Sequence, residues 1–101
     1  MSTYELKFDR LPGQVMQQVA KREKTLRKAK GLTQAQLADK AGMSLGSLRR
    51  FEQTGRVSFE SLVALSFALG CDAELDGLFA EPPYASIEEV IADARKARKA
   101  R

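Results

Sequence analysis

The sequence has no histidine and a single cysteine, Cys71, among its 101 residues. Zinc sites built from His and Cys ligands and Ser/His or Cys/His nucleophile pairs are therefore excluded, and a metal site would need carboxylates alone. The lone cysteine excludes a disulfide within the chain, and its position directly after an expected helix end favours a reduced, buried thiol. We therefore predict that the protein is not an enzyme and has no metal or cofactor.

Long apolar runs are also missing. No stretch of about 18 apolar residues is present, which excludes a membrane span. The first ten residues, MSTYELKFDR, have no basic region followed by an apolar one, so no secretion signal is expected and we predict a cytoplasmic protein. A chain of this length supports one small core, with at most an arm or a tail beside it.

Positive and negative charges are separated along the chain. Residues 1–56 hold twelve Lys and Arg against five Asp and Glu, residues 57–93 hold none against eight, and residues 94–101 hold five against none. A basic half is typical of a nucleic-acid binder, because cations near phosphates release condensed counterions. A merely solvated basic face is the alternative. The acidic half is expected to face a partner or solvent, away from DNA.

Capping and periodicity signals predict helices along most of the chain. A first helix is expected over about 13–30, with Pro12 near its start and Gly31 after its end. Shorter helices follow Thr33 and Ser44 as N-caps and end at Gly42 and Gly55. The most apolar helix, between Ser58 and Gly70, is expected to be the central core element, and one or two further turns are expected to add Leu75, Leu78 and Phe79.

The two ends of the chain carry weaker signals. Tyr4, Leu6 and Phe8 alternate with polar residues, which predicts either a strand paired with its copy in a dimer or a disordered arm docked on the core. A capping box at Ser86 and Glu89 predicts a last helix that ends in ARKARKAR. This basic tail either binds phosphates or is simply a soluble helix end.

The middle of the chain resembles a known DNA-binding family. The stretch LRKAKGLTQAQLADKAGMSLGSLRRFEQTG, followed by SFESLVALSFALG, resembles the Cro/repressor (XRE) helix-turn-helix family over Leu26 to Gly70. The resemblance implies an all-α, five-helix lambda-repressor-like domain, here with an extra C-terminal helix and a short N-terminal strand or arm. We divide the chain into an arm or intermolecular strand (1–11), a helix-turn-helix DNA-binding domain (12–80), and a C-terminal helix with its basic tail (81–101).

The resemblance assigns roles to residues on the second and third helices. Thr33 and Gln34 begin the second helix, where amide groups and the helix dipole attract a phosphate. Ser44 and Ser47 are expected to bond phosphate oxygens. Arg49 is expected to meet a phosphate or solvent. The groove-facing positions correspond to Leu45, Gly46, Ser47 and Arg50, while Leu48 and Phe51 are expected to face the core.

Base recognition is expected to depend mainly on Arg50, because a guanidinium can bond O6 and N7 of guanine together. Leu45 can pack on a thymine methyl group, and Gly46 lets the helix backbone approach the groove. Selectivity per half-site should then be modest, which favours a homodimer on half-sites about one helical turn apart. The family also implies a structural ion pair between Arg27 and Glu52.

A narrower resemblance concerns the biological role. The stretches LRRFEQTGRVSFESLVALSFALG and FAEPPYASIEEVI resemble HipB-type antitoxins, which pair with HipA-like serine/threonine kinase toxins. This implies a dimeric repressor that binds its own promoter and holds a kinase, or a small companion subunit of it. A stand-alone or phage-type XRE regulator without a toxin partner is the first alternative. A protein-interaction module whose basic face binds an acidic partner is the second.

Overall fold

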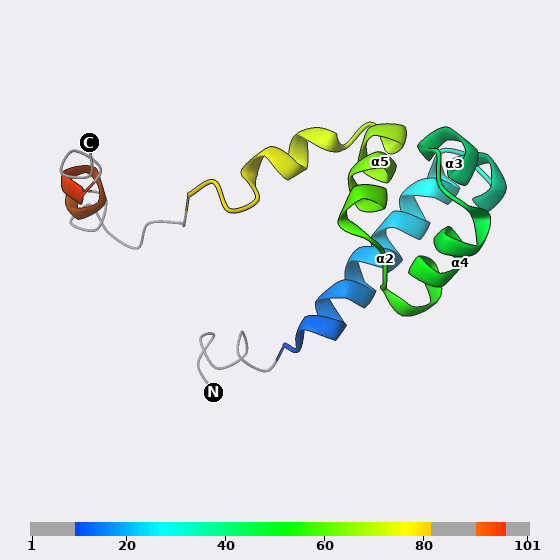
Figure 1. The fold of residues 1–101 in the computed structure, drawn as a ribbon, viewed down its shortest axis with the longest axis horizontal. Helices are drawn as coiled ribbons and strands as arrows, with labels where there is room; N and C mark the ends of the chain where they lie inside the picture. Colours follow the sequence, from blue (N-terminus) through cyan, green and yellow to red (C-terminus); the bar gives the residue numbers. More distant parts are fainter. Residues whose placement is uncertain (1–9, 82–90, 97–101) are drawn as a thin grey trace.

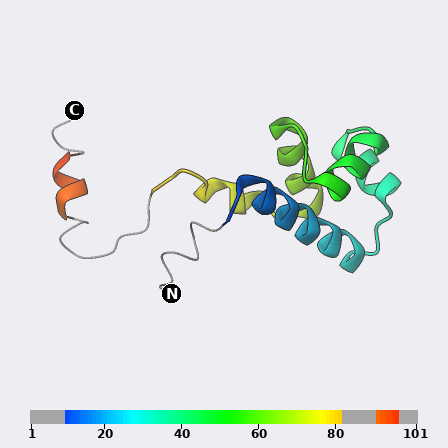
Figure 2. The same ribbon diagram turned by 90° about the horizontal axis from the view of Figure 1, so that it is seen from below.

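The computed structural model describes residues 10–81 and 91–96. Within them the chain forms α2 (Pro12–Ala29), α3 (Gln34–Ala41), α4 (Leu45–Thr54), α5 (Phe59–Leu69) and the 3₁₀ helix η1 (Asp72–Gly77) (Figure 1). Residues 91–96 are also helical, and no strand occurs in the described ranges. The all-α helix-turn-helix architecture is confirmed. Figure 2 shows α2 along one side of the group formed by α3, α4 and α5.

The helix boundaries follow the expected capping signals. The hydroxyls of Thr33, Ser44 and Ser58 each accept a hydrogen bond from the amide three residues later, at 3.0–3.1 Å. Gln36 also accepts from the amide of Thr33 at 2.9 Å, which completes the capping box of α3. Three helices end at glycines with positive φ, a conformation that side chains with a Cβ rarely adopt: Gly42, Gly55 and Gly70.

The core lies where the four α-helices meet. Its buried apolar side chains come from α2, α3, α4 and α5: Ala20, Leu37, Ala38, Leu48, Phe51, Leu65 and Leu69. Leu48 and Phe51 are spaced i, i+3 on α4, and their burial orients the opposite side of that helix outward. The expected inward positions of α4 are therefore confirmed.

The outer side of α5 and the segment after it differ from expectation. Phe59 and Phe67 are 66% and 65% exposed, and Leu78 and Phe79 are 53% and 97% exposed. The expectation that Leu78 and Phe79 add to the core is wrong. A helix with apolar side chains all round buries only the side against which another element packs, and in α5 that side carries Leu65 and Leu69.

Predictions for the two ends of the chain are only partly addressed. The N-terminal strand or arm, the capping box at Ser86 and the end of the basic tail lie outside the described residues.

Cys71 is half-buried. Burial raises the pKa of its thiol, and the negative charges of Glu74 and Asp72 raise it as well. Within the described ranges, no helix has the length and apolar character needed to cross a membrane.

Candidate nucleic-acid interface

Helices α3 and α4 form the helix-turn-helix, and their turn is set by local hydrogen bonds. Gly42 (φ 67°) ends α3, and the amide of Met43 donates to the carbonyl of Ala38 at 3.0 Å. Ser44 then caps α4, and its hydroxyl also donates to the hydroxyl of Ser47 at 2.7 Å. This bond fixes two of the predicted phosphate-binding hydroxyls beside each other at the tip of α4.

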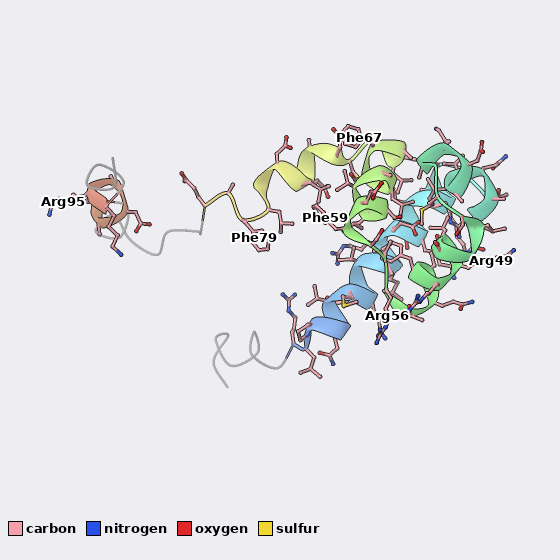
Figure 3. The ribbon with its side chains drawn as sticks, in the orientation of Figure 1. Arg49, Arg56, Phe59, Phe67, Phe79 and Arg95 are labelled. Atoms are coloured by element: carbon pink, nitrogen blue, oxygen red, sulfur yellow. The ribbon has the colours of Figure 1, made fainter. Side chains whose placement is uncertain are left out.

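The outward side of α4 carries all four residues predicted to face the groove. Gly46, Ser47 and Arg50 are exposed and Leu45 is half-buried. A Cβ added to Gly46 would meet nothing within 4 Å, so the tip of the helix has open space in front of its backbone. Arg49 is exposed as well and projects from α4 in Figure 3. This surface is therefore accessible. It carries the small residues Gly46 and Ser47 near the start of α4 and arginines further along the helix.

A hollow beside α4 adds residues that the sequence reasoning missed. It is lined by Met16, Ser47, Arg50, Arg56, Val57, Ser58 and Ser61. It therefore combines two guanidinium groups with one hydroxyl on α4 and two at the N-terminus of α5, where the positive end of the helix dipole lies. Arg56 is labelled near this point in Figure 3. The sequence GRVS does contain a signal for this site, because Arg56 lies two residues before the N-cap Ser58. The same residues also mark a helix boundary, which does not by itself indicate a binding site.

Arg27 and Glu52 form the ion pair that the family resemblance implied. Nε of Arg27 lies 2.9 Å from Oε2 of Glu52, and Nη2 donates to Oε1 at 2.9 Å, so the pair is bidentate. The remaining nitrogen, Nη1, donates to the carbonyl of Leu32 at 2.9 Å. Both side chains are buried, at 7% and 2% exposure. The hydrogen bonds to Glu52 raise the pKa of Arg27 further.

Gln34 joins the same cluster. Its Nε2 donates to Oε1 of Glu52 at 3.0 Å, so its side-chain amide links α3 to α4. Burial alone would raise the pKa of Glu52, but the hydrogen bonds from Arg27 and Gln34 and the positive charge of Arg27 lower it. A phosphate at the start of α3 would thus meet the backbone and the exposed Thr33, because the side-chain nitrogen of Gln34 is already bonded.

Glu23, which the sequence reasoning passed over, completes this buried cluster. Its side chain is in α2, only 8% exposed, and both carboxylate oxygens lack a hydrogen-bond partner. Burial and, after it, the nearby carboxylate of Glu52 together raise the pKa of Glu23 to about 8. At neutral pH Glu23 is therefore mostly protonated and uncharged, next to an ionised Glu52.

Gly55 sets the distance between α2 and the end of α4. A Cβ at this position would lie 2.8 Å from the nitrogen of Gln17 and 2.8 Å from the carbonyl carbon of Met16. Backbone therefore packs directly on backbone, with φ of Gly55 at 80°. Together with the Arg27–Glu52 pair, this contact fixes α4 relative to α2.

Comparison with known proteins agrees with this geometry. Residues 24–75, just over half of the chain, match the helix-turn-helix family model HTH_3, and the chain belongs to this family of Cro/C1-type (XRE) domains. It is an XRE-type DNA-binding protein of the kind that regulates transcription, and the family is typically non-enzymatic. A search of curated proteins gave no match.

Proposed function

We propose that the protein is a sequence-specific repressor that acts as a dimer on its own promoter. The observation that supports this most is the orientation of α4: Leu48 and Phe51 are fully buried, and Gly46, Ser47 and Arg50 are exposed on the outward side. The buried Arg27–Glu52 ion pair and Gly55 fix the position of α4, so its outward residues form a preorganised surface.

Base recognition is assigned to Arg50, Leu45 and Gly46. The guanidinium of Arg50 binds a guanine edge, and the side chain of Leu45 contacts a thymine methyl group. The open space in front of Gly46 lets the first turn of α4 approach the base pairs closely. Few hydrogen bonds are available at this tip, so each half-site carries modest selectivity and two half-sites are needed.

Phosphate binding is assigned to the hollow between α4 and α5 and to the start of α3. Arg56 and the N-terminus of α5 bind one phosphate of the strand that passes Ser47. Thr33, Gln34 and Ser44 lie at the starts of α3 and α4, where helix dipoles attract a second phosphate. These contacts position the protein on DNA and carry no base information.

A titration against DNA tests this assignment. The protein is mixed with its own upstream DNA and with scrambled DNA at several salt concentrations, and Arg50→Ala is compared with Arg49→Ala as a matched neighbour. Arg50→Ala should weaken binding to the upstream fragment about 5- to 150-fold, equivalent to about 1–3 kcal/mol, and remove the preference over scrambled DNA. Arg49→Ala should weaken both fragments alike and reduce the salt slope by about one.

Two results would contradict the assignment. Equal binding of the natural protein to both fragments would mean that α4 only contacts phosphates. An unchanged preference in Arg50→Ala, lost instead in Arg49→Ala, would transfer the base-reading role to the neighbouring arginine.

We further propose that the repressor is the antitoxin of a HipBA-like toxin–antitoxin system and holds a HipA-like kinase or its companion subunit. Support comes from the sequence resemblance to HipB-type proteins and from the acidic α5–η1 region, which lies outside the basic α4 surface. Co-expression with a HipA-like kinase encoded by a neighbouring gene should give a complex that survives purification. If no such complex forms, the protein is a stand-alone XRE regulator, and the promoter-binding proposal is unaffected.

A further inference from the structure

Large apolar side chains are exposed on α5 and directly after η1, and those of Phe59, Phe67 and Phe79 lie away from Arg49 in Figure 3. We call Phe59, Phe67, Leu78 and Phe79 the phenylalanine face. With about 200 Å² for each aromatic side chain, its three phenylalanines expose roughly 450 Å² of apolar surface. Such an area is within the range of functional patches on soluble monomers.

Phe79 is held in an uncommon backbone conformation. Its φ is 61°, and it has the only positive φ of any non-glycine residue in the described ranges. A bulky residue in this region costs energy, yet here the ring is 97% exposed and packs on almost nothing in its own chain. Contacts among the described residues therefore do not offset the cost of this conformation.

The charges around the phenylalanine face restrict what can cover it. Residues 57–81 contain five acids and no Lys or Arg: Glu60, Asp72, Glu74, Asp76 and Glu81. Placing two such faces together in a symmetric dimer would bring acids against acids. The covering surface must therefore be apolar at its centre and basic at its edge.

The C-terminal segment of the chain has this combination. Ile87, Val90, Ile91 and Ala94 recur at the spacing of one helix face, and residues 94–101 add five cations and no acid. The structure describes residues 91–96 as helical, with Ile91 46% exposed. Ile91 and the phenylalanine face are thus both exposed in the described part of the chain.

We propose that residues 86–101 of one copy pack across the phenylalanine face of a second copy, and that reciprocal exchange of these segments holds the dimer together. Two faces and two covering segments bury more than about 1,200 Å², the lower end of stable interfaces. This inference rests on the dimer proposed above and names the surface that forms it. It also leaves the α4 side of each copy free.

The test measures association of the full chain by analytical ultracentrifugation with two complementary variants. The tail variant carries Arg95→Glu and Lys96→Glu, and the face variant carries Glu74→Lys and Asp76→Lys. Each alone should weaken dimerisation at least tenfold. An equal mixture should recover dimers, because the intact tail of the face variant still fits the intact face of the tail variant. Lys21→Glu with Lys28→Glu, the same charge change on α2, should leave dimerisation unchanged.

Several outcomes would overturn the inference. A tail variant that dimerises like the natural protein would show that the dimer forms elsewhere. A mixture that stays monomeric would show that the tail of one copy does not pair with the face of the other. A natural protein that is monomeric at all concentrations would remove both this interface and the proposed dimer. DNA titration of the same samples tests the proposed function separately. A dimer that depends on the tail but does not prefer its upstream DNA would support this interface and contradict the repressor function.

Discussion

The junction of α2 with α4 and the packing of α3 on α5 hold one small domain by different means. At the junction, three ionisable side chains are buried together, namely Glu23, Arg27 and Glu52, and Gly55 lets two backbones touch. Between α3 and α5 the most deeply buried side chains are apolar, with Leu37 and Leu65 at 0% and 1% exposure. One contact depends on direction and distance, and the other mainly on buried area.

This difference matters because α4 carries the residues assigned to base recognition. Apolar burial is non-directional and tolerates small shifts, whereas a bidentate ion pair holds only at specific distances and angles. The junction therefore positions α4, and the α3–α5 layer supplies bulk stability. Substitutions that conserve size should cost most at the junction and least in the apolar layer.

The largest effect is expected from Arg27→Met, which keeps much of the side-chain length but removes the charge. Glu52 then retains only Gln34 as a donor, and the carbonyl of Leu32 loses its partner. Removing one member of a buried pair costs about 3–5 kcal/mol in the free energy of unfolding, which urea denaturation measures.

A double variant separates geometry from charge at this site. The double variant Arg27→Met with Glu52→Leu should be more stable than either single variant. It removes both charges of the pair, whereas each single variant leaves one buried charge without its partner. If the losses in unfolding free energy of the two single variants simply add in the double variant, Arg27 and Glu52 are not energetically coupled. The ion pair would then not fix α4 relative to α2.

The next effect concerns Gly55→Ala, with Gly42→Ala as its matched control. Both glycines end helices with positive φ, so each alanine should cost about 1 kcal/mol from the backbone conformation. At Gly55 the new methyl also meets the backbone of α2 at 2.8 Å, whereas at Gly42 it meets nothing within 4 Å. The clash should bring the total at Gly55 to about 3 kcal/mol. Equal melting temperatures for the two variants would contradict a backbone contact between α2 and α4.

Local signals explain how much of this arrangement was predictable. Helix starts at Thr33, Ser44 and Ser58 depend on side chains bonding amides three residues away, which a sequence displays directly. The partnership of Arg27 with Glu52 spans 25 residues, and only the family resemblance indicated it. The arrangement of α4 was thus predictable from caps and from i, i+3 spacing, together with that resemblance.

Features that depend on tertiary packing were not predictable. Glu23 lies in a stretch rich in Lys and Arg and resembles any solvated acid until α4 covers it. Gly55 looks like other helix-ending glycines until α2 lies against it. Phe59 and Phe67 belong to a helix that is apolar all round, so the sequence does not show which side remains exposed.

A third prediction concerns pH. The pKa of Glu23 rises from 4.5 to about 8 on folding, so between these values the folded state holds a proton that the unfolded state has released. Stability is therefore greatest below about pH 4.5 as far as Glu23 is concerned, and it falls as pH rises to about 8. Each pKa unit corresponds to about 1.4 kcal/mol, so even half of the shift makes the protein about 2 kcal/mol less stable at pH 8.5 than at pH 5.

Glu23→Gln tests the source of this slope. The amide cannot ionise, so the variant should keep nearly the same stability from pH 5 to pH 8.5 and exceed the natural protein at the upper end. Glu60→Gln, at an exposed position of α5, should retain the natural slope. Parallel profiles for the natural protein and Glu23→Gln would mean that the buried carboxyl stays ionised throughout.

The smallest effect is expected in the apolar layer. Leu65→Met changes shape but conserves volume at a position that is 1% exposed, and a flexible thioether can fill the same space between α3 and α5. The cost should stay below about 1.5 kcal/mol, and affinity for DNA should be unchanged because α4 is positioned by α2. Denaturation and DNA titration of this variant beside Arg27→Met test the contrast directly. If Leu65→Met weakens DNA binding as much as Arg27→Met does, then α4 depends on the whole core for its position, and the division between a positioning junction and a stabilising layer fails.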